Sequence, residues 1–175
     1  MPGAAPSPAS ELPKPHDSAD VEASIARYER GAARLRAACG GLSAEQANRR
    51  VGPGTWSVQE VAVHLLDSDL AATHRMRRIA AEDQPLLVAY DENAFIARLP
   101  ADRLDLGEVL AAFEANRRFT ARWLRTLAPG DFARTGIHTE RGKVTLGEIV
   151  STYAWHVDHH LAFVEGKRRT LGIAG

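Results

Sequence analysis

The residues with the clearest chemical potential in this chain are His156 and His160, four residues apart in the run YAWHVDHH. Four residues make about one helical turn, so both imidazoles project from the same side of a helix. With Ile149, Tyr153 and Phe163 they repeat every three to four residues, a spacing that turns one helix face toward a core. Two buried imidazoles need a polar partner. A divalent metal ion would satisfy both, although a core histidine can also donate to a backbone carbonyl.

His64 is a third histidine on an apolar helical face, where it lies between Val61 and Ser68. A lone histidine at such a position can be an ordinary core residue with a satisfied ring. In a helical bundle, however, metal sites are built from side chains on facing helices. His64, His156 and His160 could therefore hold a divalent metal through three neutral imidazoles and leave one coordination position open for a reactant. Zinc, nickel and other first-row metals all accept imidazole, so the ligands do not select among them.

Other polar residues could assist such a site. Asp67 follows His64 by three residues and leans toward the same side, where a carboxylate could orient an imidazole or hold a water molecule. A surface ion pair with an arginine is the alternative for Asp67. His159 is rotated by about 100° from its neighbour in the helix, so it is expected to face another helix or solvent rather than the metal, with a place behind the metal ligands or at the pocket rim as the alternative. His138 could reach the pocket mouth from a hairpin-like segment.

Four long amphipathic patterns must position these side chains, at about residues 20–39, 57–82, 105–127 and 145–167. Capping-box signatures open the second and fourth patterns, at Ser57-Val58-Gln59-Glu60 and Thr145-Leu146-Gly147-Glu148. The pair Gly40-Gly41 ends the first. These patterns predict an all-α protein built as a four-helix bundle.

The connections and the N-terminus complete the predicted organisation. Segments 43–49 and 91–98 could be short accessory helices, separated from each other by the second long helix and an irregular crossing. Segment 132–145 could be a small hairpin, since Glu140-Arg141-Gly142-Lys143 suits a turn. Residues 1–17 hold five of the nine prolines and are predicted to be a disordered tail, which leaves 18–175 as the bundle domain.

Composition excludes several classes of protein. Lys plus Arg and Asp plus Glu both number 22, so the chain lacks the basic excess typical of nucleic-acid binding. The single cysteine, Cys39, excludes an intrachain disulfide and is expected to be a small buried hydrophobe rather than a reactive thiol. The absence of an apolar run of about 20 residues argues against a membrane span. Without a recognisable signal peptide, we expect a cytoplasmic protein.

Three segments together resemble the DinB/YfiT-like family. They are the run GTWSVQEVAVHLLDS that contains His64, the tripeptide Tyr90-Asp91-Glu92, and the run YAWHVDHH, and the similarity covers roughly residues 20–170. The separation of 92 residues between His64 and His156 also fits. The resemblance implies a four-helix bundle in up-down-down-up order. It further implies one zinc or nickel ion bound by His64, His156 and His160, and a homodimer.

The same resemblance implies an activity. YfiT-like proteins are described as metal-dependent hydrolases, and similar proteins join bacillithiol or a related low-molecular-weight thiol to an electrophile. The expected function is therefore a metal-dependent hydrolase or transferase that activates water or a bacillithiol- or mycothiol-like thiol against a small-molecule electrophile. A non-enzymatic metal-binding module in a stress response is the alternative. The chain departs from its relatives at Phe163 and Thr139, so the pocket mouth, including Glu140, is where substrate preference should differ.

Overall fold

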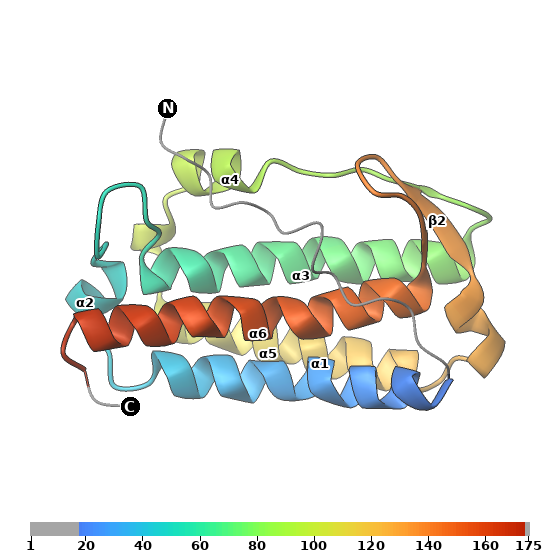
Figure 1. Ribbon diagram of the computed structural model, residues 1–175, viewed down its shortest axis with the longest axis horizontal. Coiled ribbons are helices and arrows are strands. Elements are labelled where there is room, and N and C mark those ends of the chain that lie inside the picture. The colour runs from blue at the N-terminus through green and yellow to red at the C-terminus, as the bar shows by residue number, and fades with distance from the viewer. Residues whose placement is uncertain (1–17, 174–175) are drawn as a thin grey trace.

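The computed structural model describes residues 18–173, so the predicted disordered tail over residues 1–17 lies outside the described residues. Four long helices form the body of the protein (Figure 1): α1 (Ser18–Cys39), α3 (Val58–Ala81), α5 (Leu106–Leu124) and α6 (Leu146–Thr170). The four-helix bundle predicted from the sequence is confirmed, and the helix ends differ from the predicted ones by no more than three residues.

The helices run in up-down-down-up order. Contacts between α1 and α6 advance together along both helices, from Ser24 with Ser151 to Ala38 with Arg168, so these two helices are parallel. Figure 1 shows α3 and α5 running in the opposite direction to α1 and α6. Each helix packs against two of the other three, and α3 lies between α5 and α6. The two helices with the candidate histidines, α3 and α6, are therefore antiparallel neighbours.

Local sequence signals fix where α3 and α6 begin. The Ser57 hydroxyl accepts a hydrogen bond from the Glu60 backbone N–H at 3.1 Å, and the Glu60 carboxylate accepts one from the Ser57 N–H at 2.7 Å. Thr145 and Glu148 form the same reciprocal pair at the start of α6. Both predicted capping boxes are present, and they satisfy backbone donors that would otherwise lack partners in the first turn.

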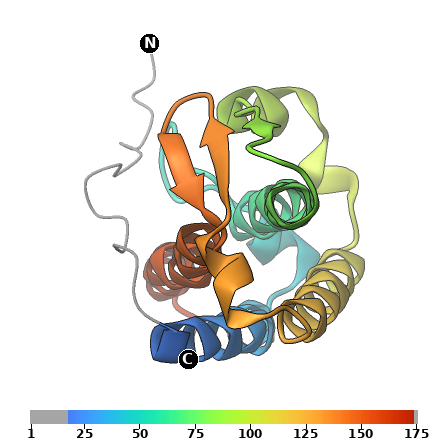
Figure 2. The ribbon, with the colours of Figure 1, turned by 90° about the vertical axis from the view of Figure 1, so that its right-hand side faces the viewer.

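The connections form a second layer beside α3 and α6, on the side away from α1 (Figure 2). It contains α4 (Glu92–Arg98) and a small sheet of β1 (Leu86–Leu87), β2 (Thr135–His138) and β3 (Gly142–Thr145). The predicted hairpin is the antiparallel β2–β3 pair. The parallel pairing of β1 with β2 was not predicted, because a strand of two residues has no detectable period and depends on a distant partner.

The remaining short elements join the long helices at their ends. They are α2 (Ala44–Asn48) and two 3₁₀ turns, η1 (Ala101–Arg103) and η2 (Pro129–Ala133). The predicted short helices at 43–49 and 91–98 are thus confirmed as α2 and α4. None of the helices within residues 18–173 combines the length and apolar character needed to cross a membrane.

Two large apolar clusters fill the bundle and flank its centre. One gathers around Tyr28 and Ile79, and the other, which includes Leu35, Phe113 and Cys39, lies nearer the opposite end. Cys39 is buried, as predicted for a small core residue, and burial raises the pKa of its thiol to about 11. One prediction for the core is wrong: Phe163, assigned to the buried stripe of α6, is 44% exposed. Three residues beyond His160, it packs against His159 at the surface.

Candidate metal centre

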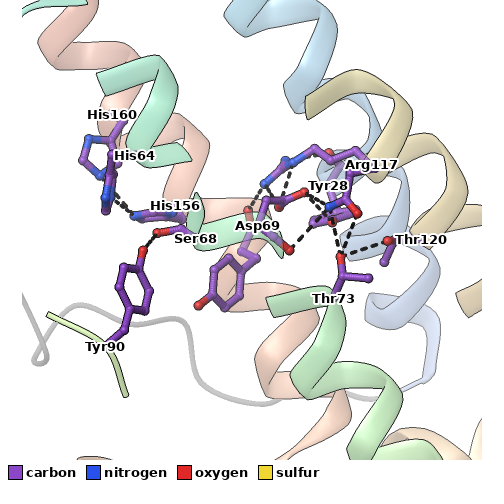
Figure 3. Close-up of polar contacts among 12 residues, drawn as sticks. Tyr28, His64, Ser68, Asp69, Thr73, Tyr90, Arg117, Thr120, His156 and His160 are labelled. Atoms are coloured by element: carbon purple, nitrogen blue, oxygen red, sulfur yellow. Dashed lines mark hydrogen bonds and ion pairs between the residues drawn. The ribbon is translucent and has the colours of Figure 1, made fainter. Parts of the chain in front are cut away.

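His64 from α3 meets His156 and His160 from α6 at one point between the two helices (Figure 3). The Nε2 atoms of His64 and His156 are 3.3 Å apart, and those of His156 and His160 are 3.0 Å apart. One ring nitrogen of each histidine lies within 4.8 Å of the other two. The structure therefore brings together all three histidines that the sequence singled out.

The donor set fits a metal ion better than it fits internal hydrogen bonds. A neutral imidazole nitrogen carries either one proton or one lone pair, so Nε2 of His156 cannot satisfy both neighbouring nitrogens. A tetrahedral ion with metal–nitrogen bonds of about 2.0–2.1 Å holds its ligand nitrogens about 3.3 Å apart. The separations of 3.3 and 3.0 Å are close to that value. One cation would accept all three lone pairs at once.

Aromatic packing orients the rings. Trp56 lies directly before the cap of α3, and its ring centroid is 4.9 Å from that of His64. The same indole is nearly parallel to His160, with 5° between the planes and 6.4 Å between the centroids. Nδ1 of His160 is buried without a hydrogen-bond partner in the part of the chain that the structure describes. The His160 ring is therefore held by aromatic neighbours, without the hydrogen bond that the second nitrogen of a metal-binding histidine usually makes.

Burial keeps the three imidazoles neutral. It lowers the pKa of His64 to about 4. Burial, with the nearby His64 and His159, lowers the pKa of His160 to about 2. The pKa of His156 lies well below its usual value, chiefly because of burial and then because of His160, His64 and Arg117. At neutral pH all three rings are in the deprotonated form that binds metals.

Metal affinity is accordingly expected to vary little with pH between 7.5 and 6.0. Protons compete with a metal only near or below a ligand's pKa, and these pKa values lie at about 4 for His64 and about 2 for His160. Three ordinary imidazoles, with pKa values of about 6.5, would lose about 50-fold in affinity over that range. We expect a change below about threefold, measured by competition with a chelator of known pH dependence. A fall of tens of fold would contradict the depressed pKa values.

A carboxylate that the sequence did not single out as catalytic lies beside the triad. Glu92 is the first residue of α4, and its Oε2 is 3.8 Å from Nε2 of His64. The Asp91 side chain caps this helix by accepting a hydrogen bond from the Ala94 N–H at 2.9 Å, which holds Glu92 in place. Burial raises the pKa of Glu92, and the charges of Asp91 and Glu140 raise it further. Its membership of the Tyr90-Asp91-Glu92 motif was the only sequence signal for it.

Asp67 of α3 is not one of the residues that meet in the histidine cluster. It lines a cavity of about 270 Å³ together with Ala71, Arg75 and Tyr90, and burial raises the pKa of its carboxyl. Among residues 18–173 it makes no hydrogen bond to His64, so its role in orienting a ligand or holding water stays a prediction.

Two further histidines of the described chain, His138 and His159, are not members of the cluster. The ring of His159 stacks on Trp155 with centroids 4.8 Å apart. Nδ1 of His138 accepts a hydrogen bond from the Glu140 backbone N–H at 3.3 Å. Burial lowers the pKa of His138, and the charges of Arg75 and Arg141 lower it further.

Tyr90 closes the side of the triad that faces the crossing between α3 and α4. Its hydroxyl is hydrogen-bonded to Ser68, one helical turn after His64 (Figure 3). Its ring packs on Phe95 of α4, with centroids 4.9 Å apart. The site therefore has the long helices α3 and α6 on one side, and the crossing and α4 on the other.

The fold and the histidine cluster define a helical-bundle protein with a candidate three-histidine metal centre. Comparison with protein families places the chain in a known superfamily. The model of the DinB superfamily matches residues 27–164, most of the chain and all three histidines. The chain belongs to the DinB superfamily.

Individual proteins are similar to most of this chain. A protein of Oceanobacillus iheyensis named "Putative metal-dependent hydrolase" is 35% identical over 123 residues, which cover 70% of this chain and 71% of that protein. A Geobacillus kaustophilus protein of the same name is 29% identical over 164 residues, covering 93% and 92% of the two chains. The solved structure of YfiT from Bacillus subtilis, described as "a probable metal-dependent hydrolase with an unusual four-helix bundle topology", superposes with a TM-score of 0.86 at 25% identity, covering 93% of each chain.

Proposed function

We propose that this chain is a metal-dependent hydrolase in which His64, His156 and His160 hold one divalent ion, zinc or nickel. The observation that carries the proposal is the convergence of three neutral imidazole nitrogens, at 3.0 and 3.3 Å, beside a half-buried carboxylate. Three ligands leave a coordination position free, which is typical of a catalytic site rather than a structural one. The names of the relatives support the same class of reaction.

The protein groups around the free position suit activation of a nucleophile. When bound, a divalent metal in such a site would supply acidity, since it lowers the pKa of a coordinated water to about 7. Glu92 Oε2, 3.8 Å from the His64 nitrogen, is placed to accept the released proton. The raised pKa of Glu92 then lets it return that proton to a leaving group. Trp56 and Tyr90 shield the site from bulk solvent.

A low-molecular-weight thiol is the second candidate nucleophile. Glu92 could take a thiol proton as readily as one from water, and the same three histidines would serve. The sulfur would have to come from outside, because Cys39 is buried in the core with a pKa of about 11. In that case the product would be a thiol adduct of the electrophile rather than its hydrolysis product.

One assay separates these reactions. Protein loaded with zinc or nickel would be incubated with chromogenic esters and amides, and separately with a chromogenic electrophile plus bacillithiol, mycothiol or glutathione. Metal-dependent turnover of an ester or amide without a thiol supports the hydrolase. Turnover that requires one thiol indicates the transferase. Stoichiometric metal with no turnover in any arm would contradict both and favour a binding module.

Replacement of Glu92 by glutamine is expected to lower kcat by about 100-fold or more while leaving metal stoichiometry at one, because proton transfer by a placed side chain contributes about that much. Glutamine keeps the shape of the side chain but cannot accept the proton. Glu165→Gln, on the exposed surface of α6, is the matched control and should leave kcat unchanged. Equal kcat in the Glu92 variant and wild type would remove this residue from the mechanism.

A further inference from the structure

A fully buried ion pair lies at the centre of the bundle, deeper than the histidine cluster. Asp69 of α3 is 0% exposed and Arg117 of α5 is 1% exposed. Nε and Nη2 of Arg117 both donate to Oδ1 of Asp69, at 3.1 and 3.0 Å. Taking two charges out of water is costly, and a well-packed apolar pair is often at least as stable in such a position. The pair therefore calls for an explanation beyond stability.

The pair connects all four long helices. Arg117 also donates to the backbone carbonyl of Tyr28 on α1 at 2.7 Å and to that of Tyr153 on α6 at 2.8 Å. Asp69 in turn accepts hydrogen bonds from the Tyr28 hydroxyl at 2.9 Å and from the Asn116 amide at 2.8 Å. Every polar atom of the two charged groups points at a fixed partner, so the network resists sliding of one helix along another (Figure 3).

This network adjoins the candidate metal ligands on both helices. Asp69 lies five residues after His64 on α3, a little more than one turn away. Tyr153, whose carbonyl Arg117 holds, lies three residues before His156 on α6, and the two rings are edge-to-face with centroids 5.8 Å apart. The network thus links the backbone that carries His64 to the backbone that carries His156.

Charge gives the pair a second connection to the site. Arg117 holds the Tyr153 carbonyl three residues before His156, so its guanidinium places a positive charge near the candidate ligands and would repel another positive charge there. A divalent cation at the triad would meet the same repulsion in a poorly screened interior. The Asp69 carboxylate, in direct contact with the guanidinium, offsets that charge.

We propose that Asp69 and Arg117 are positioning residues for the metal centre. They set the register of α6 against α3, and hence the spacing between the His64 and His156 nitrogens, while Asp69 neutralises a charge that would otherwise oppose the cation. The proposal rests on the proposed function only in taking the three histidines as metal ligands.

Gly31 of α1 offers a test that changes no charge and no hydrogen-bonding group. A Cβ at Gly31 would lie 2.5 Å from Nη1 of Arg117, which is too close for both atoms to stay in place. The guanidinium cannot easily move aside, because it is held by Asp69, Tyr28 and Tyr153. Gly31→Ala should therefore displace Arg117 from a helix that contributes no metal ligand.

The experiment measures zinc affinity by chelator competition and ligand geometry by the visible spectrum of the cobalt(II)-loaded protein. Asp69→Asn is expected to weaken zinc binding by about tenfold or more, the usual effect of losing a group that orients metal ligands. Gly31→Ala is expected to weaken it severalfold, and both variants should shift the cobalt spectrum. Gly166→Ala on α6 is the matched control, because the nearest atom to its new Cβ would be 3.9 Å away at Arg169.

A second control separates positioning from general loss of stability. Ile79→Ala removes fully buried apolar volume near the C-terminal end of α3, about four turns away from His64. It should lower the urea midpoint without changing zinc affinity. Wild-type zinc affinity and cobalt spectra in both Asp69→Asn and Gly31→Ala would overturn the proposal. If Asp69→Asn does not fold, the zinc affinity and cobalt spectrum of Gly31→Ala alone test the proposal. Failure of the wild-type protein to bind zinc or cobalt would instead sink the proposed function.

Discussion

Replacement of His156 by alanine is expected to abolish stoichiometric metal binding. Nε2 of His156 lies between the other two ligand nitrogens, 3.3 Å from that of His64 and 3.0 Å from that of His160. Without it, only two of the three imidazole ligands remain. Losing a residue that merely orients a ligand costs about 10–100-fold in affinity, so losing the ligand itself should cost more than about 100-fold. Elemental analysis after dialysis against buffered zinc would measure the loss.

The adjacent histidine supplies the control for that experiment. His159 is also on α6, but its ring stacks on Trp155 and its neighbour Phe163 instead of entering the cluster. His159→Ala should keep one metal per chain. Full occupancy in the His156 and His160 alanine variants would show that the cluster is an arrangement of core histidines and not a metal centre.

Asp69→Leu is expected to lower the free energy of unfolding by about 3–5 kcal/mol, because it leaves the Arg117 guanidinium charged, buried and without its carboxylate. That is a large share of the roughly 5–15 kcal/mol that holds a typical domain folded. Urea unfolding of the metal-free proteins would measure it, so that any change in metal binding does not contribute. Aggregation or failure to fold would agree with the upper end of this range.

Two further variants make the stability prediction specific. The double variant Asp69→Leu/Arg117→Met removes both charges and should recover part of the loss, since no unpaired ion remains in the core. Glu114→Gln breaks the ion pair with Arg36 on the surface, where both side chains are nearly half exposed, and should cost less than about 1 kcal/mol. A loss below about 1 kcal/mol for Asp69→Leu would mean that the interior at Arg117 is better solvated than its burial indicates.

The sequence predicted the features that repeat along the chain or have a local chemical signature. The four long helices have clear apolar periods, and reciprocal caps mark two of their starts. The three histidines were found because each lies on an apolar face, where a polar side chain is unexpected. Arg117 lay on the apolar stripe of its helix in the same way, but a single arginine there does not reveal its partner.

The remaining features depend on contacts between distant segments. The Asp69–Arg117 pair joins residues 48 positions apart, and an acidic residue within an amphipathic helix normally faces solvent. Glu92 approaches His64 only because the crossing folds back over α3 and α6. Strand β1 exists only as a partner of β2. In each case the feature depends on a neighbour in space, which the spacing of residues along the chain does not reveal.

The two sides of the site differ in how tightly they are tied to the rest of the molecule. The ligands are fixed to two helices that the bundle packs from several directions, whereas Glu92 and Tyr90 belong to a connecting stretch between Ala81 and Leu106. Insertions or substitutions in that stretch can reshape the space offered to a reactant while the ion-holding frame keeps its geometry. We expect selectivity to be the property that changes most readily among relatives of this protein, and that stretch to be the place to redesign it.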